Sequence, residues 1–159
     1  MRLFLIAAAM LSGAALLPAM PRQPPVPTPL PMVQDDSWNS IALRRDALGH
    51  YRVAAQVDGL PVEFVVDTGA SDVVLSPADA ARLGFRPGQL RFTGRASTAN
   101  GTVALAPVTL REIRIGQLSR RGVAAVVNGA DMPVSLLGMS FLSSLERWEA
   151  EGDRLMLYW

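Results

Sequence analysis

The sequence contains no cysteine and no lysine, and it has a single histidine, His50. The absence of thiols excludes cysteine nucleophiles, disulfides and thiolate metal sites. The absence of ε-amines excludes Schiff bases and a P-loop lysine. One histidine is too few for a histidine-rich zinc site. We therefore expect no metal and no cofactor, and we expect any chemistry to use carboxylates or hydroxyls.

The chain also has almost no net charge. The 159 residues include 15 basic side chains, all of them arginine, and 14 acidic ones, which leaves a formal charge of +1. A protein that binds nucleic acid electrostatically concentrates positive charge on one face, so we predict no nucleic-acid partner. The length suffices for one ordinary domain and a short terminal segment.

The first 20 residues are predicted to lie outside that domain. Residues 3–20 carry no charge and follow Arg2. As a helix, this stretch spans about 27 Å, close to the apolar thickness of a bilayer. We interpret residues 1–20 as a signal anchor, with a cleaved signal peptide as the alternative. The positive charge at the N-terminus predicts that the rest of the chain lies outside the cytoplasm.

A proline-rich segment comes next. Six of the eleven residues from Pro21 to Pro31 are proline. This composition favours extended polyproline II over a helix or a paired strand. We interpret residues 21–39 as a semi-rigid linker and residues 40–159 as the folded domain.

The domain is predicted to consist mostly of short strands. Residues 51–57 alternate apolar and polar side chains, Asp58-Gly59 is typical of a hairpin turn, and residues 61–66 form a second strand. Ser76, with proline after it and an acid three residues on, predicts a helix that ends at Gly84. Further predicted elements are strands at 73–75, 103–115, 122–127 and 154–159, strand-like arms around Asn100-Gly101, and a short helix at 140–145. The pattern indicates a mostly β domain, either a small barrel or a sandwich.

Asp67-Thr68-Gly69 is the segment most indicative of chemistry. Asp67 directly follows the apolar strand, and a hydroxyl and a glycine come next. A carboxylate buried there is costly unless a hydrogen bond or a shared charge compensates it. Thr68 can supply a hydroxyl, and Gly69 permits close backbone approach. The alternative is a turn aspartate, but the strand at 73–75 favours a functional site.

Three motifs in order resemble the retropepsin-type aspartic proteases, and among them the bacterial membrane-anchored retropepsin-like group. Residues 64–71, Phe-Val-Val-Asp-Thr-Gly-Ala-Ser, are similar to the catalytic loop of that family. Leu136-Leu137-Gly138 matches its second signature, and Ala99-Asn100-Gly101 lies where the family has the tip of its flap hairpin. The resemblance covers residues 49–159. It implies a mostly β fold, the closed barrel of the retropepsin-like acid proteases with one or two short helices.

The resemblance also implies a reaction, the hydrolysis of peptide bonds in a polypeptide substrate. Two aspartates share a proton and activate a water, with no covalent intermediate. This chain has one Asp-Thr-Gly, so the second catalytic aspartate would be Asp67 of another copy, on the two-fold axis of a homodimer. The alternative is a catalytically silent peptide-binding or dimerisation module of the same fold at the cell envelope.

The family implies supporting roles for neighbouring residues. Thr68 would bond across the dimer axis and Gly69 would lie beside the substrate backbone. Ala70 and Ser71 would complete the loop, although retroviral enzymes often have an aspartate where Ser71 stands. The other expected roles are a flap at Ala99, Asn100 and Gly101, with a plain hairpin as the alternative, and a structural support beneath the loop at Leu136, Leu137 and Gly138.

Three expectations concern the remaining features. The anchor and the resemblance together predict a single-pass protein of a bacterial inner membrane with its catalytic domain in the periplasm, or an exported enzyme if residues 1–20 are cleaved. His50 has no paired nucleophile, so we interpret it as a surface or strand-start residue. The aromatic residues Trp148, Tyr158 and Trp159 are expected in the core or in an interface.

Overall fold

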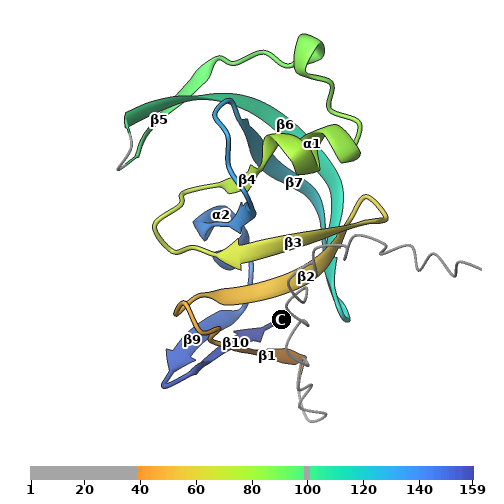
Figure 1. Ribbon diagram of the computed structural model, residues 1–159. Helices are drawn as coiled ribbons and strands as arrows, with labels where there is room; N and C mark the ends of the chain where they lie inside the picture. The colour runs from red at the N-terminus through yellow and green to blue at the C-terminus, as the bar shows by residue number, and fades with distance from the viewer. Residues whose placement is uncertain (1–38, 99–100) are drawn as a thin grey trace, which may run out of the picture.

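The computed structural model describes residues 39–98 and 101–159 (Figure 1). In chain order its elements are β1 (Ser40–Arg44), β2 (Tyr51–Val57), β3 (Leu60–Val66), β4 (Val73–Leu75), α1 (Pro77–Arg82), the 3-10 helix η1 (Pro87–Gln89), β5 (Gly94–Thr98), β6 (Gly101–Ile115), β7 (Leu118–Asn128), β8 (Ser135–Leu137), α2 (Met139–Leu142), β9 (Arg147–Glu151) and β10 (Arg154–Tyr158). The predicted anchor, the linker up to residue 38 and the flap residues Ala99 and Asn100 lie outside the described residues. No helix within the two described ranges is long and apolar enough to cross a membrane.

Six strands close into a barrel. Their order is β2-β3-β8-β4-β7-β6, and β2 pairs with β6 to complete the circle, while β5 extends the sheet beyond β6. Inward-facing side chains from these strands fill the core, among them the fully buried Phe64, Leu75, Leu110, Ile113 and Leu137. The prediction of a mostly β closed barrel with one or two short helices is confirmed. The strand pattern allowed a barrel or a sandwich, and the pairing of β2 with β6 makes it a barrel.

The β2–β3 hairpin forms where the sequence predicts it. Asp58 and Gly59 have φ angles of 52° and 88°, the left-handed backbone of a tight hairpin turn. The Asp58 carboxylate also accepts the N–H of Glu112 at 2.9 Å, which ties the turn to β6. Alternate residues of β2 are buried, namely Val53, Ala55 and Val57, as expected of a strand with one face on the core.

A second sheet, in the order β1-β10-β9, lies at the bottom of Figure 1. The sequence patterns predict β10 but neither β1 nor β9. β9 reads Arg-Trp-Glu-Ala-Glu, and only Trp148 in it is partly buried, because the strand lies at a sheet edge and faces mostly solvent. Trp148 and Trp159 pack against the core, and Tyr158 is half-buried.

The two α-helices are short, and a serine side chain caps the first of them. Ser76 Oγ accepts the N–H of Asp79 at 3.1 Å, which caps α1 as the sequence pattern predicts. The prediction of a helix at 140–145 is wrong in its bounds, because α2 spans Met139–Leu142. Ser144 Oγ donates to the carbonyl of Phe141 at 2.6 Å, and such side-chain bonds compete with continued helical pairing.

Candidate active site

Asp67 leaves the barrel at the end of β3. Val66, the last residue of that strand, pairs with Tyr51 of β2 on one side and with Leu137 of β8 on the other. The N–H of Asp67 donates to the carbonyl of Leu137 at 3.1 Å, and the carbonyl of Asp67 accepts the N–H of Ala70 at 3.2 Å. Asp67 is half-buried. Its carboxyl group therefore stands on a tight turn whose backbone is bonded both to itself and to β8.

Gly69 lies close against the carboxylate of Asp67. Its N–H donates to Asp67 Oδ1 at 2.8 Å, and a Cβ added at Gly69 would lie 3.1 Å from the same oxygen. Gly69 does not have a positive φ. The glycine therefore serves close approach to the acid rather than an unusual backbone angle. Of the other loop residues, Thr68 and Ser71 are exposed and Ala70 is half-buried.

β8 lies between β3 and β4 and supports the loop that joins them. It runs parallel to β3 and antiparallel to β4, where Val74 pairs with Leu136. Directly after β8, the N–H of Met139 donates to the carbonyl of Ala70, and the N–H of Ser140 donates to the carbonyl of Ser71, each at 2.8 Å. Residues 67–71 are thus held along their inner side by consecutive backbone groups from β8 and α2.

Gly138 is the point of closest contact beneath the loop. A Cβ at this position would lie 2.1 Å from the carbonyl oxygen of Asp72 and 2.6 Å from that of Ala70, distances that no side chain can satisfy. Leu137 beside it is fully buried, whereas Leu136 is partly buried. The structure therefore brings Leu136, Leu137 and Gly138 together with the Asp67 loop.

The flap segment is described on both sides of its tip. Thr98 pairs with Gly101 across the β5–β6 hairpin, and Thr98 Oγ1 donates to the carbonyl of Gly101 at 2.8 Å. Gly101 has a φ of 110°, so glycine suits this end of the turn. The hairpin and the loop that follows β3 both extend toward the left of Figure 1. Ala99 and Asn100 lie outside the described residues.

The structure shows a carboxylate network at the beginning of β8 that the sequence patterns did not predict. Asp79 Oδ2 accepts the hydroxyl of Ser135 at 2.6 Å and that of Ser76 at 2.9 Å, and Asp79 Oδ1 pairs with Arg82. Burial raises the pKa of Asp79, but the hydrogen bonds from Ser135, Arg82 and Ser76 together hold that pKa below its usual value. Sequence reasoning assigned Asp79 only to the first turn of a helix. The available signal was Ser135, a polar residue just before the apolar Leu136-Leu137 pair.

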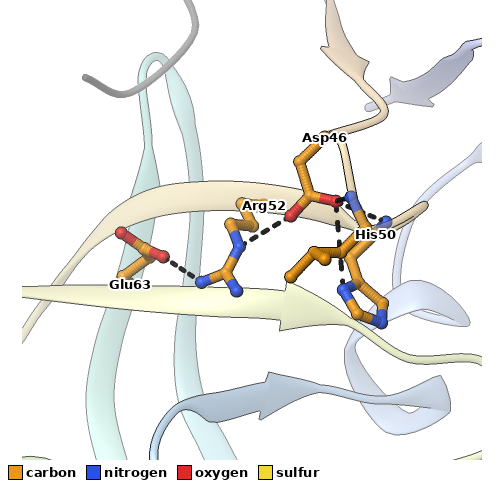
Figure 2. Close-up of polar contacts among 5 residues, drawn as sticks. Asp46, His50, Arg52 and Glu63 are labelled. Carbon is orange, nitrogen blue, oxygen red and sulfur yellow. Dashed lines mark hydrogen bonds and ion pairs between the residues drawn. The ribbon is translucent and has the colours of Figure 1, made fainter. Parts of the chain in front are cut away.

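A second carboxylate network joins the segment before β2 to β2 and β3 (Figure 2). Asp46 accepts the backbone N–H of His50 at 2.8 Å and the Nε of Arg52 at 2.9 Å, and Arg52 also donates to Glu63 at 2.5 Å. The N–H of His50, followed by Arg52, lowers the pKa of Asp46. His50 is an exposed residue directly before β2. Since Tyr51 pairs with Val66, His50 stands next to the point where Asp67 leaves β3.

Within the described residues, no group of three or more acidic or histidine side chains is arranged to hold a metal ion.

A comparison with known families decides the identity of this fold and loop. Residues 53–144 match the model of the family described as "gag-polyprotein putative aspartyl protease". The matched range contains Asp67 and its loop, the β5–β6 hairpin, and β8 with Gly138. The chain belongs to this aspartyl protease family.

Solved structures of retropepsin-like aspartic proteases share the fold. The crystal structure of such a protease from Rickettsia conorii is 38% identical, with a TM-score of 0.69 over 75% of this chain and 90% of that one. The EIAV protease, solved in complex with the inhibitor HBY-793, is 22% identical with a TM-score of 0.52, over 62% of this chain and 90% of that one. The second likeness bears on the fold alone.

Two curated relatives of this aspartyl protease family member are uncharacterized proteins. One, from Sinorhizobium sp, is 39% identical over 127 residues, which is 79% of this chain and 54% of the relative. The other, from Rickettsia prowazekii, is 36% identical over 117 residues, which is 74% of this chain and 50% of the relative. The chain thus spans about half the length of the curated relatives that it matches.

Proposed function

We propose that this chain is an aspartic endopeptidase that hydrolyses peptide bonds as a homodimer. The observation that carries the proposal is the single Asp67-Thr68-Gly69 loop, set at the end of a strand in a retropepsin-like barrel. Retropepsin-like proteases act as homodimers on peptide substrates. A chain with one such loop needs a second copy to assemble the pair of carboxylates.

The proposed chemistry follows from bringing two Asp67 carboxyl groups together on the dimer axis. Two carboxylates held a few ångströms apart cannot both ionise cheaply, so the pair shares one proton. The ionised carboxylate takes a proton from a water that attacks the scissile carbonyl, and the protonated one donates to that carbonyl oxygen. The backbone bond from Gly69 to Asp67 Oδ1 supports this role, because it fixes the orientation of the carboxyl group before substrate binds.

The cellular setting is proposed from residues 1–39. A charge-free segment at 3–20 and a proline-rich linker would tether the domain to a bacterial inner membrane, with the catalytic domain in the periplasm. Cleavage of the segment would release an exported enzyme. While the domain stays tethered, substrates close to the membrane surface would be favoured.

The test is cleavage of a complex peptide library by the full chain in detergent, between pH 4 and pH 7. Asp67→Asn preserves the shape of the side chain and removes the shared proton, so hydrolysis should fall by roughly 100-fold or more. Asp131→Asn is the matched control, because Asp131 is exposed and lies in the loop before β8. The control should cleave as wild type does, and a statine-type transition-state mimic should inhibit both.

Two outcomes would contradict the proposal. Undiminished cleavage by Asp67→Asn would assign the activity to another group or protein. A folded, dimeric wild-type chain that binds peptides and cleaves none of them would instead establish a silent peptide-binding module.

A further inference from the structure

We propose that Asp79 is a positioning residue for the catalytic loop, acting on Asp67 through Ser135 and β8. The inference rests on the proposed function for its kinetic consequence. Its structural content, that Asp79 controls how firmly the backbone of Asp67 is held, stands independently of any activity.

The first step is the contact between Asp79 and Ser135. Their oxygens lie 2.6 Å apart, although the two residues are 56 positions apart in the chain. Ser135 is completely buried, and Ser76, which shares the same carboxylate oxygen, is 1% exposed. The N–H of Ser76 donates to Ser135 Oγ at 3.0 Å. The Ser135 hydroxyl therefore accepts from one side and must direct its own proton to Asp79.

The second step leads from Ser135 to Asp67. Ser135 is the first residue of β8 and pairs with Phe64 of β3, and two residues later Leu137 supplies the carbonyl that binds the N–H of Asp67. Ser76 follows directly after β4, the other strand beside β8. Asp79 thus joins the end of β4 to the beginning of β8. A shift of β8 along β3 would move the Leu137 carbonyl away from Asp67.

The third step concerns charge. An ionised carboxylate can accept both serine hydroxyls and the Arg82 guanidinium at once, and hydrogen bonds to a charged acceptor are stronger than neutral ones. In Asp79→Asn, the single side-chain oxygen would accept the two serine hydroxyls as a neutral, weaker acceptor. The NH₂ group would then face the Arg82 guanidinium, so that two hydrogen-bond donors would lie opposite each other. Asp79→Asn should therefore loosen the junction without changing side-chain volume.

The competing interpretation is that Asp79 only caps α1. Its N–H and its carboxylate both contact Ser76, so part of its contribution is local to the helix. A cap alone would affect amides of α1, such as that of Ala80, which donates to the carbonyl of Ser76. A positioning residue would also affect the two amides that join β8 and the residue after it to the catalytic loop. These are the N–H of Asp67, which donates to Leu137, and the N–H of Met139, which donates to Ala70.

The experiment combines amide hydrogen exchange with kinetics on the full chain. The variants are Asp79→Asn and Ser135→Ala, and the control is Asp58→Asn. Asp58 is matched to Asp79, because both side chains are 13% exposed, both carboxylates accept a hydrogen bond from a residue distant in the chain, and both pair with an arginine. Asp58 lies at the opposite end of the β2–β3 hairpin from Asp67.

We expect exchange at the Asp67 and Met139 amides to rise about tenfold in Asp79→Asn, which replaces a charged acceptor of the buried Ser135 hydroxyl by a neutral one. Ser135→Ala should raise it by at least as much, because it removes that bond and the one from the N–H of Ser76. The turnover number on a cleaved peptide should fall by a similar factor with KM nearly unchanged, because substrate contacts remain. Asp58→Asn should alter neither quantity.

Several outcomes would overturn the proposal. Faster exchange confined to α1 would make Asp79 a helix cap only. Slower turnover without faster exchange at Asp67 would show that the effect does not pass through β8. If Asp79→Asn does not fold, Ser135→Ala, which keeps the Asp79–Arg82 pair, decides between the same outcomes. A wild-type chain without peptidase activity would refute the proposed function, and the exchange data would still decide the positioning role.

Discussion

Two carboxylates support opposite sides of the strand that leads to Asp67. Asp79 acts on the β8 side through two buried serine hydroxyls, and Asp46 acts on the β2 side through the exposed Arg52. Both have a lowered pKa, but from different sources: hydrogen bonds that outweigh burial at Asp79, and a backbone N–H with an exposed guanidinium at Asp46. Water can replace the partners of Asp46 but cannot reach Ser135. The comparison indicates that the β8 side holds Asp67 in place, whereas the β2 side mainly shapes a turn.

The largest effect is expected from the closest packing on the β8 side. Gly138→Ala would place a Cβ 2.1 Å from the carbonyl oxygen of Asp72, so the loop or α2 must move. We expect a loss of at least about 3 kcal/mol in the free energy of unfolding, and a Tm lower by roughly 10 °C or more. Thermal unfolding followed by circular dichroism measures this.

The control for Gly138 is Gly88→Ala. An added Cβ at Gly88 meets nothing within 4 Å, and Gly88 has no positive φ. The Tm of Gly88→Ala should stay close to that of wild type. Equal Tm values for the two variants would mean that the loop above Gly138 is free to yield, which would remove the basis for calling the β8 side the rigid one.

An intermediate effect on the free energy of unfolding is expected when the pH is lowered. Because the pKa of Asp79 is lower in the folded protein than in the unfolded chain, the unfolded chain binds more protons in the interval between the two values. The stabilisation from Asp79 should be complete above about pH 4 and should be lost as the pH falls through the folded-state pKa. Urea unfolding of wild type and Asp79→Asn from pH 6 to pH 2 should therefore give free energies that converge at low pH.

Added salt in the same urea experiment distinguishes the contribution of Asp46 to stability from that of Asp79. The lowered pKa of Asp46 implies the same direction of pH dependence, but the charge of its exposed partner Arg52 is screened by ions. Asp79 instead has two buried neutral partners, the hydroxyls of Ser76 and Ser135, which salt does not screen. In 0.5 M NaCl the difference between wild type and Asp46→Asn should shrink, whereas the difference for Asp79→Asn should persist. If salt abolishes both differences, burial does not distinguish the two sites.

The smallest effect is expected from Arg52→Gln. This change breaks the ion pairs with Asp46 and Glu63, whose side chains are 20% and 52% exposed. Exposed pairs contribute little after desolvation and side-chain entropy, so the Tm should change by no more than a few degrees. The Asp46 carboxylate keeps its bonds to the N–H groups of Leu48 and His50, so the turn should remain closed. A Tm loss as large as that of Gly138→Ala would reverse the ranking.

Local patterns were sufficient for much of the fold. The alternation in residues 51–57, the Asp58-Gly59 turn and the serine cap of α1 each concern neighbours within a few positions, and the structure has all three. The edge strand β9 was missed because its polar sequence reflects its exposure, not its hydrogen bonding. The bounds of α2 were missed because the residues after Leu142 form turns, in which the N–H of Ser144 donates to Phe141 and that of Leu145 to Leu142.

The sequence by itself determined the Asp67-Thr68-Gly69 loop, the apolar strand before it and the glycine of the second signature, because these are contiguous residues with a recognisable chemical order. Only the tertiary structure decided that β8 enters between β3 and β4, that Gly138 touches two loop carbonyls, and that Ser135 meets Asp79 across 56 positions. Strand periodicity reports which residues are buried but not which strands become neighbours. The contacts that hold the catalytic loop arise from that choice of neighbours.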